Sequence, residues 1–584
     1  MENEASSLIE ALGLDANRSP DRGRLRDLQR GEQLIRRGDH ADSLFLVLRG
    51  RFDVRVAERT VAEIAEGQPV GEIAFFTGGE RTADVIAGRD ASVLELTRAD
   101  FDALVAERPD VGVAVTRWLA SRLAKVAARV PALERSVPRC TCVLPAATGG
   151  LPTALVDALR RAMPGIRFIG VADLPTHVDK NDEATIAAYL LDREGRDGRT
   201  IYLIEKDGAF ARAAVRQSDA VALVAELGSG EREPSPLERY AAELHEAANA
   251  SLVLWREQAD MSISGTPEWL APRAVNLHHH VALDRAADAE RLARFITGRA
   301  RGMVMGGGGA LGCAHMGVAR AILEAGMPID MWGGTSFGGA IAIAFGMGLS
   351  PEEVMDRVET IFLHNAALGR LTVPLYGLMD PHHFERQMQE HYGQADITDL
   401  PFNAFAASTS LTTNDLYVHR SGPTWVAVRS TGSLPLVLPP FVMEDGEVLV
   451  DGGLIDNLPI GTMRGLKRGP NVMVNLAPDR EYRLKTPYSE LPMGRLRLLG
   501  DLVRRKRRGD LPKMGSVLSR TMVVSSRRLM AATEIGDDIL VTPPSIRRMG
   551  LLDWKKARAQ EQQAYEHTRT LIENGEMEAL RQPT

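Results

Sequence analysis

The amino-acid sequence predicts a multidomain protein in which a small β-roll precedes two α/β domains. The chain of 584 residues is longer than a single hydrophobic core supports. Between Leu25 and Leu96, short runs of alternating apolar and polar residues are separated by glycines, which is typical of the strands of a roll or barrel. From Thr141 onward, short apolar runs alternate with segments of helical periodicity, which predicts parallel α/β layers. We expect the domains at residues 1–130, 135–298 and 299–480, with a helical, partly basic extension at 481–584.

The composition is that of an ordinary globular protein, and it argues against several classes. The formal net charge of −7 gives no sign of a nucleic-acid partner. The three cysteines, Cys140, Cys142 and Cys313, are too few for a disulfide framework and suit a reducing compartment. Cys140 and Cys142 have no second pair with which to hold zinc, so no metal site is expected.

The N-terminus and the hydropathy pattern predict a cytoplasmic location. Residues 1–15 are acidic and lack the basic start and the apolar core of a signal peptide. No uninterrupted apolar run approaches the roughly 20 residues that cross a bilayer. Any contact with a membrane is therefore expected to be peripheral.

The predicted β-roll contains the segment GEIAFFTGGERTA, from Gly71 to Ala83. This segment resembles the phosphate-binding cassette of cyclic-nucleotide-binding domains. The resemblance implies cAMP or cGMP as a regulatory ligand. Glu72 would accept a hydrogen bond from the ribose 2′-hydroxyl, and Arg81 would pair with the cyclic phosphate beside Gly71, Thr82 and Ala83.

The same residues leave a second interpretation open. Domains of this kind also occur as unliganded docking modules. Glu72 and Arg81 would then form an ordinary surface ion pair, which contributes about 0–1 kcal/mol to stability. The presence of both polar residues favours nucleotide binding only slightly.

Residues 135–298 predict a parallel α/β domain without recognisable chemistry. The loop Ala146–Gly150 follows a short predicted strand, but no Gly-Lys-Ser/Thr comes after it, so the P-loop motif is absent. His278, His279 and His280 lie on a predicted strand, where adjacent side chains face opposite sides and cannot all bind one metal ion. We expect a structural or interaction domain.

The stretch Arg301–Phe345 predicts a strand, a glycine loop, a helix, a second strand, a sharp turn and a second helix. Gly334, Ser336 and Gly338 form Gly-x-Ser-x-Gly at the sharp turn, which is the pattern of a nucleophile elbow. The earlier loop, Gly306–Gly309, can present backbone N–H groups to a developing oxyanion. The alternative is an incidental serine in a glycine-rich turn.

Further elements are predicted between the elbow and the last part of the domain. Pro351–Phe362 has helical periodicity, and a second helix is expected to start near Asp380. Phe402–Ser408 and Leu416–His419 are predicted to be strands. Thr424–Val428, rich in β-branched and aromatic residues, is also predicted to be a strand.

A third motif follows the predicted strand Gly446–Val450. There Asp451 precedes two glycines, so its carboxylate can point into a site without a crowding neighbour. An α/β-hydrolase triad needs a histidine after its acid, and only His567, in a polar helical tail, follows Asp451. The pattern therefore favours a dyad of Ser336 and Asp451 over a triad.

The glycine loop, Gly-x-Ser-x-Gly and Asp-Gly-Gly, in this order, resemble the motifs of patatin-like phospholipases. With the two preceding domains, the chain resembles the neuropathy target esterase family from about residue 25 to 480. The resemblance implies hydrolysis of acyl esters in phospholipids or lysophospholipids, with no required cofactor. It assigns Ser336 as nucleophile, Asp451 as base, and the amides of Gly307, Gly308 and Gly309 as the oxyanion hole.

One residue of the oxyanion loop departs from the family pattern. The position before the last glycine, usually Arg or Lys, is Leu311. The missing cation leaves a second function open: a cyclic-nucleotide-responsive scaffold or signalling protein whose hydrolase domain is weak or inactive. His315, one helical turn beyond the loop, is expected to pack rather than to act as a base.

The C-terminal extension contains a basic amphipathic stretch. Gly494–Arg508 interleaves leucines with arginines. Such a helix can rest on an anionic membrane surface, or it can be a solvated basic face of the domain. The sequence supports both interpretations equally.

Overall fold

The structure, a computed structural model, describes residues 23–56, 59–107, 137–147, 149–476, 533–547 and 549–581. The chain forms two compact units. The first holds Met1–Ala300 with the short segment Arg464–Arg468, and the second holds Arg301–Met463 and Gly469–Pro583. The basic stretch Gly494–Arg508 lies outside the described residues.

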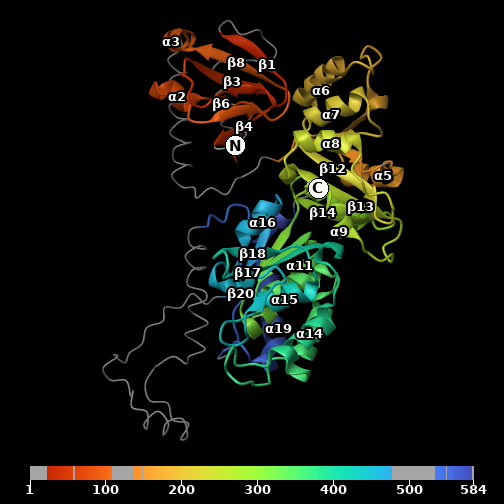
Figure 1. Ribbon diagram of the computed structural model, residues 1–584, viewed down its shortest axis with the longest axis vertical. Helices are drawn as coiled ribbons and strands as arrows, with labels where there is room; N and C mark the ends of the chain where they lie inside the picture. Colours follow the sequence, from red (N-terminus) through yellow and green to blue (C-terminus); the bar gives the residue numbers. More distant parts are fainter. Residues whose placement is uncertain are drawn as a thin grey trace. The chain divides into compact units, whose positions relative to one another are not determined.

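The N-terminal part of the first unit is the predicted β-roll (Figure 1). Two four-stranded antiparallel sheets have the strand orders β1-β8-β3-β6 and β2-β7-β4-β5. Successive residues of β3 face opposite sides, so Phe45 and Val47 join one core cluster while Leu44 and Leu46 join another with Phe75. The elements are β1 (Arg24–Leu28), β2 (Gln33–Ile35), β3 (Ser43–Arg49), β4 (Arg51–Val56), β5 (Arg59–Ala65), β6 (Pro69–Val70), α2 (Glu72–Thr77), β7 (Asp84–Ala87), β8 (Ala91–Thr97) and α3 (Arg98–Glu107).

A parallel sheet of six strands, ordered β10-β11-β9-β12-β13-β14, forms the rest of the first unit and confirms the predicted α/β layer. In β9, Leu144 and Val143 belong to different core clusters, so both faces of the sheet are buried, as in other parallel sheets. The strands are β9 (Cys140–Pro145), β10 (Arg167–Gly170), β11 (Thr200–Leu203), β12 (Ala220–Glu226), β13 (Ala250–Arg256) and β14 (Leu277–Ala282). The main helices are α5 (Thr153–Ala162), α6 (Glu183–Asp197), α7 (Ala209–Gln217), α8 (Pro236–Leu244) and α10 (Ala286–Ile296).

The three consecutive histidines alternate along β14, as expected. The rings of His278 and His280 lie 5.3 Å apart, whereas His279 packs on Phe295 of α10. No cluster of three or more potential metal ligands occurs in the described part of the chain.

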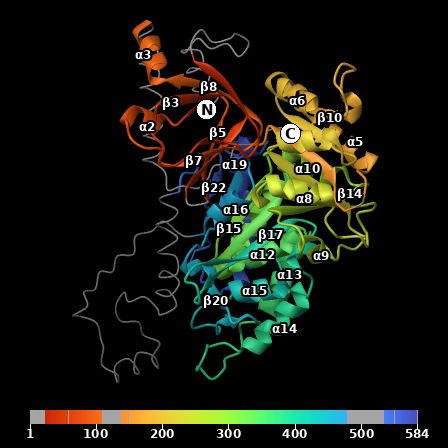
Figure 2. The ribbon, with the colours of Figure 1, turned by 45° about the horizontal axis from the view of Figure 1, so that its top comes forward.

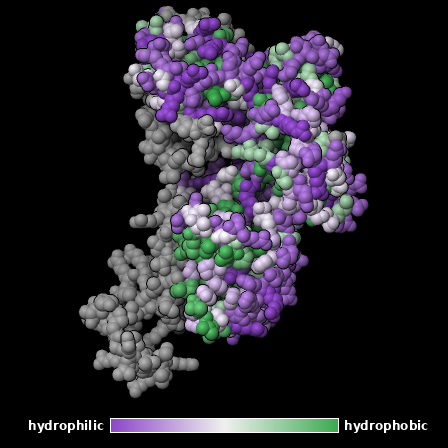
Figure 3. All heavy atoms as spheres, viewed as in Figure 1, coloured by the Kyte–Doolittle hydropathy of each residue, from purple (hydrophilic) through white to green (hydrophobic). Residues whose placement is uncertain are grey.

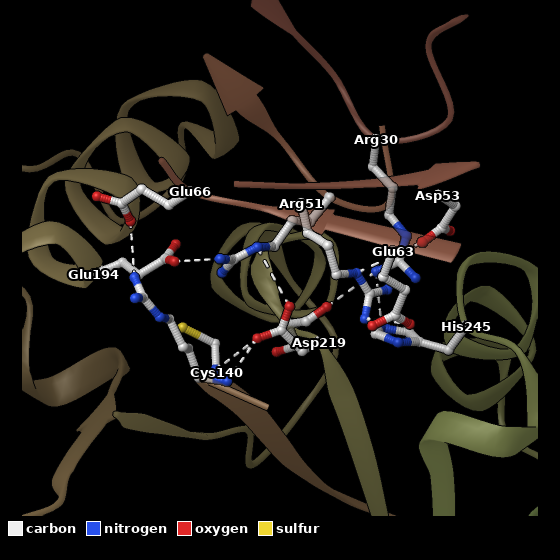
Figure 4. Close-up of polar contacts among 12 residues, drawn as sticks. Arg30, Arg51, Asp53, Glu63, Glu66, Cys140, Glu194, Asp219 and His245 are labelled. Atoms are coloured by element: carbon white, nitrogen blue, oxygen red, sulfur yellow. Dashed lines mark hydrogen bonds and ion pairs between the residues drawn. The ribbon is translucent and has the colours of Figure 1, made fainter. Parts of the chain in front are cut away.

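Buried polar contacts join the β-roll to the parallel sheet within the first unit (Figure 4). Arg89 of the roll pairs with Glu194 of α6 and, at 3.3 Å, with Asp219, which lies just before β12. Arg30 donates to the carbonyl oxygens of Val215 and Ser218 at 3.3 and 3.2 Å. Val215 is in the last turn of α7, where the helix dipole favours a positive charge.

A mixed sheet organises the second unit (Figure 2). Its strand order is β19-β20-β17-β16-β15-β21-β22, and β18 pairs with β17. The core strands β15, β16, β17, β21 and β22 are parallel, whereas β18 and β20 run antiparallel to β17. The strands are β15 (Gly302–Met305), β16 (Met331–Thr335), β17 (Asn403–Ser410), β18 (Leu416–His419), β19 (Phe441–Val442), β20 (Val448–Asp451), β21 (Asn471–Val474) and β22 (Ile539–Val541).

The helices of the second unit include one that is buried along its whole length, α12 (Phe337–Gly346). Another, α11 (Ala314–Glu324), packs so closely on α19 (Ala557–Glu573) that a Cβ at Gly317 would lie 2.0 Å from the carbonyl oxygen of Glu561. None of the described helices is long and apolar enough to cross a membrane. The others are α13 (Pro351–Val358), α14 (Pro381–Tyr392), α15 (Thr424–Thr431) and α16 (Ile460–Leu466).

The prediction of a strand at Thr424–Val428 is wrong, because these residues begin helix α15. Pro423 precedes the helix, and the hydroxyl of Thr424 donates to the carbonyl oxygen of Tyr392 at 2.7 Å. Tertiary packing therefore overrides the strand propensity of the β-branched run.

Candidate active site

The glycine loop connects β15 to α11 and is held by backbone contacts. The amide of Gly306 donates to Val474, and that of Ala310 donates to Leu551 at 2.7 Å. A Cβ at Gly307 would lie 2.8 Å from the Cβ of Ser336, and one at Gly309, where φ is +54°, would lie 2.3 Å from the carbonyl oxygen of Leu551. Glycines are therefore required for the loop to pass this close to the serine.

Ser336 lies at the predicted sharp turn between β16 and α12. Its φ of 56° and ψ of −129° are strained for a residue with a side chain, as expected for a nucleophile elbow. A Cβ at Gly334 or Gly338 would lie 2.6 or 2.2 Å from the carbonyl oxygen of Met305, which explains both flanking glycines. The local sequence thus forces the turn that presents Ser336.

A threonine outside the sequence motifs holds the elbow. The backbone amide of Ser336 donates to the hydroxyl oxygen of Thr431 at 2.7 Å. That hydroxyl in turn donates to the carbonyl oxygen of Ala407 in β17. Thr431 is the last residue of α15, so the helix at the position of the predicted strand supports the backbone of Ser336.

Asp451 ends β20 and faces the serine directly. The hydroxyl of Ser336 donates to Oδ2 of Asp451 at 2.5 Å, and the amide of Gly453 donates to Oδ1 at 2.9 Å. A Cβ at Gly452 would lie 2.4 Å from the carbonyl oxygen of Ala407, so glycine is required there too. The structure thus brings together two residues that lie 115 positions apart in the sequence.

The carboxyl of Asp451 is buried, and this burial raises its pKa to about 6. The hydrogen bonds from Ser336 and Gly453 act in the opposite direction but are weaker. The carboxylate is therefore more basic than an ordinary aspartate, whose pKa is about 3.9, and still largely ionised at pH 7.

The histidines near this region pack elsewhere. His315 is buried, and its Nε2 lies 2.7 Å from the carbonyl oxygen of Gly306. Burial lowers its pKa to about 4, so the ring is neutral and donates to that oxygen. His419 of β18 contacts the hydroxyl of Ser408 at 2.8 Å. The expectation that His315 packs agrees with this geometry.

The predicted oxyanion-hole glycines differ in their hydrogen bonding. The amide of Gly307 donates to the carbonyl oxygen of Asn457 at 3.3 Å, and the side-chain amide of Asn457 donates back to Gly307 at the same distance. Among the described residues, none accepts a hydrogen bond from the amide of Gly308 or Gly309. These two amides are therefore the available donors of the loop.

Leu311, at the position where the family usually has a cation, is half-buried. Its side chain packs against the main apolar core of the second unit. Nearby, Phe337 follows Ser336 and contacts Trp554, whose ring stacks on that of Phe362 at a centroid distance of 4.0 Å. The surroundings of the loop are thus apolar rather than cationic at this point.

The cassette residues lie at the start of α2 and in the segment before β7. Gly71 adopts the left-handed conformation that begins α2, and Glu72 is buried in its first turn. The guanidinium of Arg81 is also buried and donates to the carbonyl oxygens of Gly71 at 2.7 Å and Ser43 at 2.5 Å. Thr82 is exposed and Ala83 is half-buried. Burial of Glu72 and Arg81 does not fit the alternative of an ordinary surface ion pair.

Three known families match parts of the chain. Residues 303–464 match the patatin-like phospholipase family, residues 25–108 the cyclic nucleotide-binding domain, and residues 172–303 the neuropathy target esterase family P-loop like domain. The loop after β9 lies before the residues of the last match, and it lacks the P-loop motif.

Two relatives illustrate how much of the chain is shared. Lysophospholipase nte1 of Aspergillus fumigatus is 27% identical over 528 residues, which cover 75% of this chain and 34% of that protein. An uncharacterized NTE family protein of Mycobacterium tuberculosis is 28% identical over 553 residues, which cover 91% of this chain and 89% of that protein. The chain thus spans about a third of the length of the lysophospholipases that it matches.

Among solved structures, a cyclic nucleotide-binding domain from Methylobacillus flagellatus matches 22% of this chain and 83% of its own, with 22% identity and a TM-score of 0.19. Taken together, the fold, the motifs and the family matches define a protein with a patatin-like phospholipase domain. The residues that match the cyclic nucleotide-binding domain and the neuropathy target esterase family P-loop like domain precede it in the chain, in which respect the protein is similar to members of the neuropathy target esterase family.

Proposed function

We propose that the protein is a serine esterase that hydrolyses acyl ester bonds of phospholipids or lysophospholipids through a Ser–Asp dyad. The observation that carries the proposal is the 2.5 Å hydrogen bond from Ser336, on a strained elbow, to the buried Asp451. The name of the fungal relatives, lysophospholipase, supports the substrate class.

In the proposed reaction Asp451 takes the proton of Ser336 as Oγ attacks the ester carbonyl. The amides of Gly308 and Gly309 stabilise the oxyanion, and removal of one such donor typically costs about 10²–10³ in turnover. Asp451 then returns the proton to the leaving alcohol, and an acyl group remains on Ser336. A water molecule that Asp451 deprotonates attacks this acyl-serine, which releases the fatty acid and restores the dyad.

The dyad is tested with p-nitrophenyl butyrate and with lysophosphatidylcholine as substrates. We expect Ser336→Ala and Asp451→Asn each to lower kcat/KM by about 10³ or more, because each removes a group that takes part in both chemical steps. Ser350→Ala, at the N-terminus of α13, and Asp445→Asn, on the surface, are the matched controls.

Unchanged activity of Asp451→Asn would contradict the dyad. An inactive wild type would instead support the alternative function, a cyclic-nucleotide-responsive scaffold with a weak hydrolase domain.

We propose further that the β-roll binds cAMP or cGMP as a regulatory ligand. Support comes from the family match of residues 25–108 and from Arg81, whose buried guanidinium lies against the cassette at Gly71. Titration calorimetry of the full chain should show binding of one of these nucleotides and its loss in Arg81→Ala. Arg81→Lys keeps the charge but not the planar fork, and we expect it to weaken binding by about tenfold.

The exposed Arg36→Ala is the control for the nucleotide experiment, because it removes an arginine of the same domain from the surface. No heat with either nucleotide in the wild type would refute the proposal.

A further inference from the structure

An exposed apolar loop of the second unit lies between helices α13 and α14. It comprises Leu371–Leu378, and we call it the apolar loop. Leu371, Val373, Leu375 and Tyr376 are 77, 81, 73 and 77% exposed. Among the other described residues, no large apolar side chain is more than 60% exposed. The four side chains therefore form an unusual concentration of exposed apolar surface.

The conformation of this loop is fixed by its backbone rather than by burial of its side chains. Leu371 and Met379 form a β-bridge, and the amide of Thr372 donates to the carbonyl oxygen of Leu378 at 3.1 Å. A Cβ at the buried Gly377 would lie 3.0 Å from the nitrogen of Pro439, so the base of the loop packs closely on that residue. An ordered backbone thus holds apolar side chains in solvent.

The base of the loop is bonded to a segment that reaches the active site. The amides of Leu378 and Met379 donate to the carbonyl oxygens of Leu436 and Val437 at 3.0 and 2.9 Å. Three positions before Leu436, the carbonyl oxygen of Ser433 accepts the backbone amide of Asp451 at 3.0 Å.

Two residues earlier still, Thr431 accepts the amide of Ser336. The apolar loop and the dyad therefore share one supporting segment, residues 431–437.

Two other apolar residues of the second unit are well exposed, and the loop itself carries no charge. Leu436, in the left-handed conformation with φ of 69°, and Val442 of β19 are 57 and 60% exposed. No charged residue occurs between Arg370 and Asp380. Figure 3 shows that hydrophobic side chains gather on parts of the surface of the second unit. Tyr376 adds an aromatic ring with a polar tip, a side chain that suits the boundary between water and lipid.

We propose that Leu371, Val373, Leu375 and Tyr376 form a docking surface that inserts into the surface of a lipid bilayer or micelle. The proposal rests on the proposed function, because a lipid esterase must reach acyl chains that are held in aggregates. An uncharged apolar loop that shares its support with the dyad fits such a surface. Insertion brings the site to the aggregate without moving the substrate through water.

The test separates binding from catalysis. In a Ser336→Ala background, we measure cosedimentation with large vesicles of dioleoylphosphatidylcholine, with and without Val373→Ser and Leu375→Ser. We expect the double substitution to lower vesicle binding by about tenfold or more, because two apolar side chains no longer leave water. Met261→Ser, 48% exposed in the first unit, is the matched control and should change nothing.

Kinetics provide the second readout. With an intact Ser336, the double variant should lose about tenfold or more of its activity on micellar lysophosphatidylcholine, again through weaker insertion. It should hydrolyse monomeric p-nitrophenyl butyrate at the wild-type rate. A wild type that binds vesicles through the loop but hydrolyses neither ester supports the docking surface and refutes the esterase.

Three outcomes overturn the docking surface. The first is equal vesicle binding by the double variant and its parent. The second is an equal loss of activity on both substrates, which indicates a structural effect. The third is a wild-type dimer that dissociates in the double variant while neither binds vesicles, which makes the occupant a second copy of the chain.

Tyr376→Trp guards against misfolding of the double variant. Its added fluorescence should shift to the blue when vesicles are added, and an unchanged spectrum counts against insertion.

Discussion

Asp219 in the first unit and Asp451 in the second are both buried aspartates, yet their pKa values move in opposite directions. Burial raises the pKa of each carboxyl. For Asp219 the attraction of Arg89 and Arg51 outweighs burial, together with the amides of Cys140 and Arg139, and the pKa is lowered. For Asp451 the hydrogen bonds from one hydroxyl and one amide do not outweigh the effect of burial, and the pKa rises to about 6.

This difference separates a carboxylate that is paired with a cation from the carboxylate of the proposed dyad. Asp219 accepts from the amides of Arg139 and Cys140 at 2.8 and 3.1 Å and pairs with Arg89, so its negative charge has a cationic partner (Figure 4). Asp451 has a proton donor in contact and no compensating cation among the groups that set its pKa. A buried charge without a cation is costly for stability but makes the carboxylate a stronger base.

The largest effect on stability is expected from breaking the compensated pair. Asp219→Asn leaves the buried Arg89 with only Glu194 as its anionic partner. Removal of one member of a buried pair typically costs about 3–5 kcal/mol. We expect a loss of that size in the unfolding free energy of the first unit, measured by calorimetry or chemical denaturation.

The matched control for this prediction is Asp207→Asn. Asp207 pairs with Arg212 at 3.3 Å, but both side chains are about half exposed. Such a pair contributes about 0–1 kcal/mol. A similar effect of the two substitutions would mean that the contacts between the β-roll and the parallel sheet add no more than a surface ion pair.

Substitution of Asp451, the proposed base, is expected to stabilise the second unit. Because folding raises the pKa of Asp451, its favourable contribution is fully present below its pKa in the unfolded chain and is lost as the pH rises through about 6. Above that pH, the ionised carboxylate makes folding less favourable by about 3 kcal/mol. Asp451→Asn removes the charge and should stabilise the second unit by up to this amount at pH 8.

The pH dependence is the decisive part of this prediction. The gain in Asp451→Asn should shrink as the pH falls from 8 to 5 and disappear near pH 4, where both proteins carry a neutral side chain. Denaturation curves at several pH values check it, with the exposed Asp445→Asn as control. A gain that does not vary with pH would show that Asp451 is not a destabilising buried charge.

Some parts of the candidate site can be predicted from the sequence. Ser336 and Asp451 are predicted from Gly-x-Ser-x-Gly and Asp-Gly-Gly, and the structure shows why these neighbours are glycine: a side chain at Gly338 would meet the backbone of β15, and one at Gly452 that of β17. Close approach thus leaves a local sequence pattern. The roll and the two α/β layers were predicted for a similar reason, because alternation and helical periodicity follow directly from burial of one face.

The contacts that support the site and the first unit have no such pattern in the sequence. Thr431 lies 95 positions from Ser336, in a run whose composition favours a strand, and Asn457 follows the Asp-Gly-Gly motif as an ordinary polar residue. Arg89 and Asp219 are separated by 130 positions and look like surface charges in the sequence. Because the fold brings these partners together from distant positions, the residues next to each of them in the sequence do not reveal the pairing.

The smallest expected effect concerns this hidden support. Thr431→Val keeps the shape of the side chain but removes the acceptor for the amide of Ser336 and the donor to Ala407. A lost hydrogen bond of this kind costs about 1–3 kcal/mol when a buried group stays unpaired. Because the amide belongs to Ser336, the proposed nucleophile, we expect kcat to fall about tenfold with little change in KM.

Thr431→Ser keeps the hydroxyl and should restore most of the activity. A merely structural role of Thr431 would instead lower the amount of folded protein, with kcat unchanged per folded molecule. The two variants therefore decide whether the uncompensated carboxylate suffices to activate Ser336, or whether the elbow also needs a fixed acceptor. Equal kcat in the wild type, Thr431→Val and Thr431→Ser would favour the first answer, in which the proposed dyad needs no support from Thr431.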